Sequence, residues 1–433
     1  MLRFNNNKKN DVVIIVEHLN RELESALLLE RALGERQITS KIVFKGWNEG
    51  PASCFIRPKV IVTPWCYDNK DIKALCGYHG GFADGSFDIV DLHSEQVTTP
   101  DGLSFVLPTD RAKQAFHICW GQFFSDALAS VGVDACRICV AGSNRLDFFR
   151  EEFREFSLRK DQLGKEFGID PAKPWVLFIG NFSTAFFSDE RVAELDARGL
   201  FNTSENRETS KRAYKETLSW MVDALCDSAF KDVEFIYRPH PSEPVSERLQ
   251  EIEAEFTNLH VIKKHAIRDW FLNCDIGLTW CSTSSVEAAY AGLPVFALRP
   301  FEIPAHLQFK LLETIEQIDS SQELRNTIAR VLLGNSGQVN AEFVKAISLY
   351  YKRGANSATD EIADAIGKII SENSGRFNCE RSPFYCIRKV LGFTVKQAAF
   401  YSGLMRKKTS WRILADDHIT HKQLTRKREL ING

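Results

Sequence analysis

The 433-residue sequence lacks a long hydrophobic run, because Asp, Glu, Lys or Arg interrupts every candidate before the ~18 apolar residues of a membrane span. Its first residues, MLRFNNNKKND, are polar and lack the apolar core and small-residue cleavage site of a secretory signal. It contains neither a G-x-G-x-x-G nor a Walker motif, which disfavours dinucleotide binding and NTP hydrolysis. We therefore expect a cytoplasmic protein, soluble or peripheral at the inner face of a membrane.

The net charge is also small, at −2, but the charged residues are unevenly distributed along the chain. Residues 375–433 hold 13 Lys and Arg against 4 Asp and Glu, so this tail carries +9 and residues 1–374 carry −11. The tail mixes its cations with aromatic and apolar side chains, which favours a helix on an anionic membrane surface. Charged helices packed on the body are the alternative. No nucleic-acid-binding motif accompanies the tail, so we expect no nucleic-acid partner.

Cysteines arranged for disulfides or for a zinc site are lacking as well. The chain has 11 Cys, an odd number, and most of them lie within apolar runs. Cys136 and Cys139 form one C-x-x-C pair, but no second Cys or His pair completes a zinc set. We therefore expect reduced thiols and no metal site.

Apolar runs that alternate with helical patterns are the main positive signal. In the first third of the chain the runs are 12–16, 41–44, 59–63, 87–92 and 137–141. Continuous Val and Ile runs are typical of parallel strands that helices cover on both faces. We predict an α/β domain over residues 1–149.

A second series of such signals follows a charged stretch, 150–173, which we interpret as a linker. Its expected strands are 175–180, 233–237, 259–262, 275–280 and 294–298, with helical patterns between them. The sequence thus predicts a second doubly wound domain over 174–374 and a basic helical tail over 375–433. Two such domains facing each other would place the carboxyl ends of both sheets at one cleft, where open α/β sheets bind ligands.

The densest chemical motif, RPHPSE, begins at Arg238, where an expected strand ends. Two prolines, Pro239 and Pro241, fix the turn around His240. A rigid histidine can donate to a phosphate oxygen and pass a proton to a departing phosphate, whose second pKa of about 6 is near that of imidazole. Arg238 could clamp an anion with two donors. A histidine held by loop packing and an arginine paired with a surface carboxylate are the alternatives.

The second motif, TWCSTSSVE, runs from an expected strand into a helix and ends at Glu287. Its hydroxyls, including those of Ser282, Ser284 and Ser285, cluster with backbone amides at a helix N-terminus, where the helix dipole favours an anion. Glu287, one turn further in, could reach a ribose hydroxyl. Ser and Thr are also ordinary capping residues, so a purely structural helix start is the alternative.

An HP pair followed about 40 residues later by an SS pair that opens a helix resembles bacterial sialyltransferases and polysialyltransferases of the GT-B fold, and related CMP-Kdo transferases. The strings Trp120-Gly121, AGSNRLD ending at Asp147, and Asn181-Phe182-Ser183 are similar to the bacterial surface carbohydrate biosynthesis family. The likeness spans residues 11 to about 370. It implies that His240, Ser284 and Ser285 hold the phosphate of a CMP-activated acidic sugar, and that Asn181 belongs to the same donor site.

The family's acidic D/E-D/E-G pattern is incomplete here, because Ala83 precedes Asp84 and Gly85. Asp84 would act as the base towards the acceptor hydroxyl, and the glycine would let the acceptor approach the backbone. An ordinary Asp-Gly turn is the alternative. Glu95 is the reserve carboxylate. The remaining candidates for the acceptor cleft are His79, in a glycine-rich stretch, and the two neighbours of Glu95, Asp91 and His93.

The chain has no Asp-x-Asp motif, which counts against a metal-dependent transferase of the GT-A type and favours a leaving phosphate neutralised by His, Arg and a helix dipole. We predict a metal-independent GT-B glycosyltransferase that moves an acidic keto sugar of sialic, pseudaminic, legionaminic or Kdo type from CMP onto a bacterial surface glycan or lipid-linked acceptor. Three alternatives remain open: a CDP-glycerol or CDP-ribitol phosphotransferase, a UDP-sugar epimerase, and a non-catalytic member of a polysaccharide assembly complex.

Overall fold

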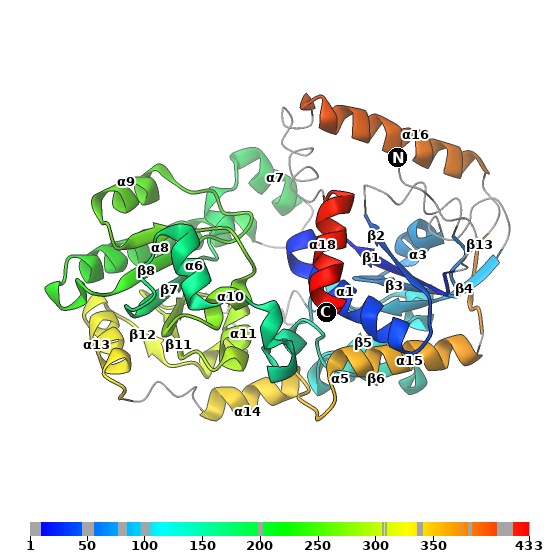
Figure 1. Ribbon diagram of the computed structural model, residues 1–433, viewed down its shortest axis with the longest axis horizontal. Helices are drawn as coiled ribbons and strands as arrows, with labels where there is room; N and C mark the ends of the chain where they lie inside the picture. Colours follow the sequence, from blue (N-terminus) through cyan, green and yellow to red (C-terminus); the bar gives the residue numbers. More distant parts are fainter. Residues whose placement is uncertain are drawn as a thin grey trace. The chain divides into compact units, whose positions relative to one another are not determined.

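The computed structural model forms two compact α/β units (Figure 1). Unit 1 comprises residues 1–147 and 348–433, and unit 2 comprises residues 148–347. The structure describes residues 10–45, 56–76, 85–96, 103, 105–197, 202–304, 307, 310–335, 341–372, 374–379, 383–404 and 419–432. Among the helices in these ranges, none combines the length and apolar character that a bilayer-spanning segment needs.

The sheet of unit 1 is parallel except for one strand. Its order is β2 (Ser40–Phe44), β1 (Val12–Val16), β3 (Val60–Thr63), β4 (Gly85–Asp91), β5 (Phe116–Cys119) and β6 (Ile138–Val140), and β13 (Phe377–Cys379) pairs antiparallel with β4. All five residues of β1 are buried, as the continuous Val and Ile run predicts for a strand covered on both faces. The accompanying helices include α1 (Leu19–Glu35), α3 (Asn69–Cys76), α5 (Gln122–Ser130) and α15 (Ala358–Glu372).

The last 86 residues belong to unit 1, which differs from the predicted boundary at residue 374. Helix α15 packs on α1 and buries an apolar face formed by Ile362, Ile366 and Ile369. Helix α18 (His421–Asn432) also contacts α1. Part of the predicted basic tail is thus a structural element of the first unit, because its cations pair with acids of the acidic body.

Two ion pairs hold α18 on α1. The Lys427 ammonium lies 2.7 Å from a Glu24 carboxylate oxygen, and the Arg428 guanidinium donates two hydrogen bonds to Glu30, at 2.7 and 2.8 Å. Helix α16 (Pro383–Tyr401) lies between β13 and α18 in the chain.

Unit 2 contains a wholly parallel sheet. Its order is β12 (Gln317–Ile318), β11 (Val295–Leu298), β10 (Ile276–Thr279), β7 (Trp175–Ile179), β8 (Glu234–Arg238) and β9 (Leu259–Val261). Its helices are α6 (Lys160–Phe167), α7 (Asp189–Ala197), α8 (Thr203–Leu225), α9 (Glu247–Glu255), α10 (Ile267–Phe271), α11 (Ser284–Ala291), α12 (Lys310–Glu313), α13 (Ser321–Leu332) and most of α14 (Ala341–Tyr350). The predicted strands of this half of the chain are present.

The predicted linker, 150–173, is instead an integral part of unit 2. Its backbone is fixed by side chains of α10: Asp269 accepts from the Leu158 amide at 3.1 Å, and Arg268 donates to the Phe156 carbonyl at 3.1 Å. The Arg268 guanidinium also lies 4.2 Å from the ring centroid of Phe148, within cation–π distance. The high charge of the segment suggested a solvated connection, whereas its Phe167 ring packs against Trp270 of α10, with the ring centroids 5.5 Å apart.

The strand order of unit 2 reverses direction between β7 and β10. From β7 the chain proceeds to β8 and β9 on one side, and it then returns to the other side of β7 to form β10. In open parallel sheets such a reversal leaves a crevice at the carboxyl ends of the strands, where ligands bind. The loops that follow β7, β8 and β10 therefore define the place to look for a site.

Candidate functional site in unit 2

The loop after β8 holds His240 in one orientation. The exposed imidazole has its Nδ1 atom 2.9 Å from the Ser183 hydroxyl and 2.8 Å from the Ser242 hydroxyl. The Ser242 amide also donates to Nδ1, at 3.3 Å. Because an amide N–H can only donate, Nδ1 is the accepting nitrogen, and the neutral ring carries its proton on Nε2. His240 therefore presents an N–H donor at the carboxyl edge of the sheet.

The buried carboxylate of Glu243 fixes the conformation of this loop. The sequence analysis assigned no function to this residue. One of its oxygens accepts from the Tyr237 hydroxyl at 2.8 Å, and the other from the Phe182 amide at 2.9 Å and the His240 amide at 3.4 Å. The side chain is fully buried, and burial raises its pKa. Glu243 thus ties the loop after β8 to the loop after β7.

Gly180 allows these two loops to approach closely. A Cβ atom at this position would lie 2.9 Å from both the Arg238 carbonyl oxygen and a Glu243 carboxylate oxygen, closer than real Cβ contacts. The Gly180 amide donates to the same Arg238 carbonyl at 2.8 Å. Glycine is therefore the residue that fits between β7 and the histidine loop.

The serine segment after β10 begins α11, but its amides are already paired. The Ser284 amide donates to the Ser282 hydroxyl at 3.2 Å, and the Ser285 amide and hydroxyl both donate to the Ser282 carbonyl, at 3.2 and 2.8 Å. Ser282 and Ser285 are buried, whereas Ser284 and Glu287 are half-buried. The prediction of a cradle of free backbone amides is therefore wrong, because Ser282 accepts the hydrogen bonds of the amides at the start of the helix.

The structure brings the two predicted motifs to the same edge of one sheet. Strand β7 lies between β8 and β10, and the loop that follows it contacts both neighbours. Ser183 contacts His240, and the Asn181 side-chain amide donates to the Cys281 carbonyl. Asn181, predicted as a donor-site residue, therefore links the serine segment to the central strand. Pro241 is exposed beside His240.

Arg238 has a structural role in place of the predicted anion clamp. Its guanidinium donates to the Lys264 carbonyl at 2.8 Å and to the His265 carbonyl, so it fixes the segment after β9. Burial lowers the pKa of Arg238 to about 10, which leaves the side chain charged at neutral pH. The sequence could not distinguish these roles, because an arginine at a strand end suits a backbone carbonyl as well as an anion.

A cavity of about 300 Å³ adjoins the serine segment. It is lined by Cys281, Arg299, Phe301, Glu302, Ile303, Leu307, Glu313, Gln317 and Asp319. Arg299 was not recognised from the sequence. It directly follows β11, donates to the Leu298 carbonyl at 2.9 Å and to the Trp280 carbonyl, and brings a cation to the wall of the cavity. The volume is at the lower end of the range for small-molecule sites.

In unit 1 the predicted acceptor residues are only partly described. Asp84 and His79 lie outside the described residues, and Gly85 is the first residue of β4. Glu95 is largely exposed, and one of its oxygens lies 2.8 Å from the Arg21 guanidinium. The next residue, Gln96, is buried: it donates to the Ile118 carbonyl at 2.8 Å and accepts from the Trp120 amide at 2.7 Å. Gln96 thereby fixes the backbone next to Glu95.

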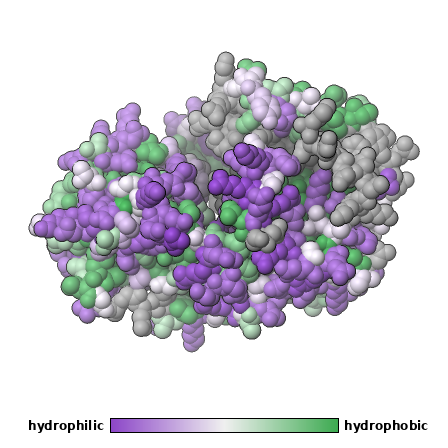
Figure 2. All heavy atoms as spheres, in the orientation of Figure 1, coloured by the Kyte–Doolittle hydropathy of each residue, from purple (hydrophilic) through white to green (hydrophobic). Residues whose placement is uncertain are grey.

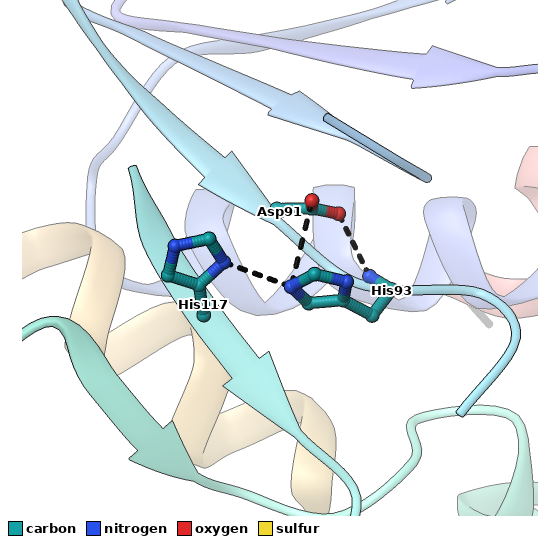
Figure 3. A group of neighbouring side chains, drawn as sticks. All are labelled: Asp91, His93 and His117. Carbon is teal, nitrogen blue, oxygen red and sulfur yellow. Dashed lines mark hydrogen bonds and ion pairs between the residues drawn. The ribbon is translucent and has the colours of Figure 1, made fainter. Parts of the chain in front are cut away.

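Asp91 and His93 are fully buried, so the prediction that they line an open acceptor cleft is wrong. Figure 3 shows that the His93 ring lies against both the Asp91 carboxylate, at the end of β4, and the His117 ring of β5. Nε2 of His93 lies 2.8 Å from Nδ1 of His117 and 3.5 Å from Asp91. Asp91 accepts from the His93 and Cys66 amides, at 2.9 and 2.8 Å.

This buried cluster supports a strained turn after β4. His93 has a φ of 45°, in the left-handed region that is unfavourable for a side chain with a Cβ atom. Among the described residues the cluster is the one group of three or more His, Cys, Asp or Glu side chains whose potential metal-ligand atoms all lie within 4.8 Å of one another. The 2.8 Å between Nε2 of His93 and Nδ1 of His117 is the length of a hydrogen bond between neutral imidazoles, and we assign the cluster this structural role.

The buried His117 ring should make the stability of the protein depend on pH. Burial lowers its pKa to about 4, whereas the ring titrates near 6.5 in the unfolded chain. The unfolded state therefore binds more protons below pH 6.5, and stability is lost as the pH falls towards 4. We expect this ring to remove about 3 kcal/mol from the free energy of unfolding over that range.

Urea denaturation at pH 7 and pH 4.5 checks this expectation in the wild type and in a His117→Gln variant. Burial raises the pKa of Asp91, a shift whose effect on stability has the opposite sign, and lowers the pKa of His93, a shift of the same sign to which His117 also contributes. The difference between the two proteins therefore reports the His117 ring together with its effect on His93. The variant should lose less stability on acidification. Equal pH dependence of both proteins would contradict the assignment.

Solved structures of other proteins share this architecture. A variant of the wall teichoic acid polymerase TagF is 12% identical over 85% of this chain and 91% of its own, with a TM-score of 0.54. The UDP-GlcNAc 2-epimerase from Neisseria meningitidis, bound to UDP-GlcNAc, is 13% identical over 82% of this chain and all of its own, with a TM-score of 0.50. The chain has the GT-B fold. No protein-family model and no curated protein sequence matches it.

The fold class predicted from the sequence, two doubly wound Rossmann-like units, is thereby confirmed. At 12% and 13% identity, the likeness to a wall teichoic acid polymerase and to a UDP-GlcNAc 2-epimerase shows the fold. The narrower resemblance to sialyltransferases and Kdo transferases stays a prediction.

Proposed function

We propose that this GT-B protein is a glycosyltransferase that transfers an acidic keto sugar from a CMP donor to a bacterial surface glycan. The observation that supports the donor site is the convergence of His240, Asn181 and the serine segment at the carboxyl edge of one sheet, beside its reversal point. This edge is where open α/β sheets bind nucleotides. The cavity next to Cys281 supplies space for part of the donor.

In this proposal the donor phosphate lies against His240. Transfer breaks the bond between the anomeric carbon and the phosphate oxygen, and negative charge develops on the departing CMP. The Nε2–H group of His240 donates a hydrogen bond to that oxygen, and the positive end of α11 stabilises the same charge. The Ser284 hydroxyl and the Glu287 carboxylate are assigned to the phosphate and the ribose. Arg238 acts by fixing the loop geometry rather than by touching the donor.

The acceptor hydroxyl forms the new bond to the anomeric carbon and gives its proton to a carboxylate. We assign this role to Glu95 or to Asp84, which the sequence ranked first. Glu95 has the supporting geometry: it is exposed beside Arg21, and buried Gln96 and the His93 turn fix its backbone. A carboxylate in this position can accept the proton of the acceptor hydroxyl, as a general base does.

Product analysis tests the proposed reaction. Purified protein given a CMP-linked keto sugar and a glycan or lipid-linked acceptor should release CMP and add the mass of one sugar acid to the acceptor. Transfer of a polyol phosphate from CDP-glycerol or CDP-ribitol would favour a phosphotransferase, a reaction class suggested by the TagF fold. Conversion of a UDP-sugar without acceptor would favour an epimerase. Nucleotide binding without turnover would favour a non-catalytic assembly protein.

Replacing Glu95 by Gln should reduce turnover by at least 100-fold and leave donor binding unchanged, because the amide cannot accept the acceptor's proton. Glu35→Gln is a matched control. Glu35 is also an exposed acid in unit 1, 3.0 Å from the Arg31 guanidinium. Steady-state kinetics with calorimetric donor titration separates the two effects. Wild-type turnover in the Glu95→Gln protein would remove Glu95 from the mechanism.

A further inference from the structure

Helix α16 exposes an apolar stripe. Its exposed large hydrophobic side chains are Phe384 (78% exposed), Ile387 (53%), Leu391 (60%) and Val395 (61%). Successive members are three, four and four residues apart, which places them on one face of an α-helix. Ala398 continues the same face and is also exposed. In the space-filling view, hydrophobic side chains are visible over this helix (Figure 2).

The other side of α16 is less exposed. Ala399 is buried, and Val390, Phe393 and Phe400 are half-buried. A helix on the surface of a soluble protein usually turns its apolar face inward and its polar face to water. In α16 the outward face is apolar over most of the length of the helix. Contiguous exposed apolar surface of this kind marks a binding surface.

Charge distinguishes between the possible occupants of the stripe. Residues 383–404 contain Arg388, Lys389 and Lys396 and no Asp or Glu. Arg388 is exposed at the border of the stripe. Two copies of this helix would bring like charges together, whereas helix pairs are stabilised by opposite charges beside the apolar seam. An anionic lipid surface offers both an apolar layer for the stripe and negative headgroups for the cations.

We propose that α16 binds an anionic lipid bilayer and lies in its interface, with the stripe in the acyl region and Arg388 at the headgroups. Three charges within the helix oppose insertion across the bilayer, and α16 is not long and apolar enough to span it. Helix α18, which carries much of the remaining positive charge, is held by Glu24 and Glu30 of α1 and does not provide this surface. The proposal does not depend on the reaction assigned to the protein.

Vesicle co-sedimentation of the full chain tests the proposal. The wild type should bind vesicles of phosphatidylglycerol and phosphatidylcholine, bind pure phosphatidylcholine much more weakly, and dissociate as salt is raised. The double variant Leu391→Asp, Val395→Asp should lose at least tenfold in partition coefficient, because it places two charges in the apolar stripe. Its circular dichroism and thermal melting should equal those of the wild type, since both side chains are exposed.

The control is the double variant Leu333→Asp, Val344→Asp in unit 2. It makes the same chemical change at side chains that are 77% and 50% exposed. It should bind vesicles like the wild type. The proposal is overturned if the wild type binds no anionic vesicles or if the stripe variant binds them equally well. It is also overturned if sedimentation equilibrium without lipid shows a dimer that only the stripe variant dissociates, because the occupant would then be a second copy.

Discussion

Replacement of His240 by Ala is expected to lower the turnover of the CMP donor by about 100- to 1,000-fold, the range that loss of one positioned hydrogen-bond donor to a developing oxyanion costs. The physical reason is the single orientation of the ring. Its Nδ1 accepts from the Ser242 amide, so the neutral ring directs an Nε2 proton to the ligand edge of the sheet. Alanine removes that donor and leaves the departing phosphate with less compensation of its charge.

His421→Ala is the matched control for this variant, because His421 is also exposed and lies in α18 of the other unit. CMP release with acceptor present measures both proteins, and urea denaturation checks that both are folded. The control should retain wild-type turnover. A His240→Ala protein that turns over at the wild-type rate would exclude His240 from the chemistry.

The largest effect on stability is expected from Glu243→Ala. This change leaves three buried donors without their acceptor: the Tyr237 hydroxyl and the amides of Phe182 and His240. Leaving buried hydrogen-bonding groups unpaired costs about 1 to 3 kcal/mol for each group, with partial relief where water enters. We expect the free energy of unfolding to fall by about 3 to 5 kcal/mol. Donor affinity should fall as well, because the histidine loop loses its anchor.

Urea denaturation and donor titration together check this result. Glu255→Ala provides the control, since Glu255 is exposed at the end of α9 and its removal should change stability by less than about 0.5 kcal/mol. Glu243→Gln should lie between the wild type and Glu243→Ala, because the amide retains one oxygen acceptor. Equal stability of Glu243→Ala and Glu255→Ala would contradict the role of this carboxylate.

Most strands of both units could be predicted from the sequence, because burial on both faces requires continuous apolar residues. The short strands β5, β12 and β13 were not among the predicted runs. Val12–Val16 and Trp175–Ile179 are fully buried strands at their predicted positions. The domain boundaries could not be predicted in the same way. The apolar face of α15, with Ile362 and Ile366, suits either sheet, and only tertiary packing assigns it to α1.

Residues of the candidate site could be predicted where their position follows from the course of the backbone. A proline-bounded histidine after a strand must lie at the carboxyl edge of a parallel sheet, and His240 does. The direction in which a polar side chain points was not predictable. Asp91 and His93 lie at the end of an expected strand, as ligand-binding residues do, yet both are fully buried: His93 contacts His117, and Asp91 accepts from the His93 amide. The role of Glu243 could not be predicted either, because its hydrogen-bond partners come from β8 and from the loop after β7.

The central claim is that the carboxyl edge of β7, β8 and β10 binds the nucleotide. Crystals of the protein soaked separately with CMP, CDP, UDP and UMP test it most directly. The account predicts that CMP is bound with its phosphate within hydrogen-bond distance of His240 and near the first turn of α11, and that UMP is bound less well. Nucleotide bound elsewhere, with His240 untouched, would contradict the account.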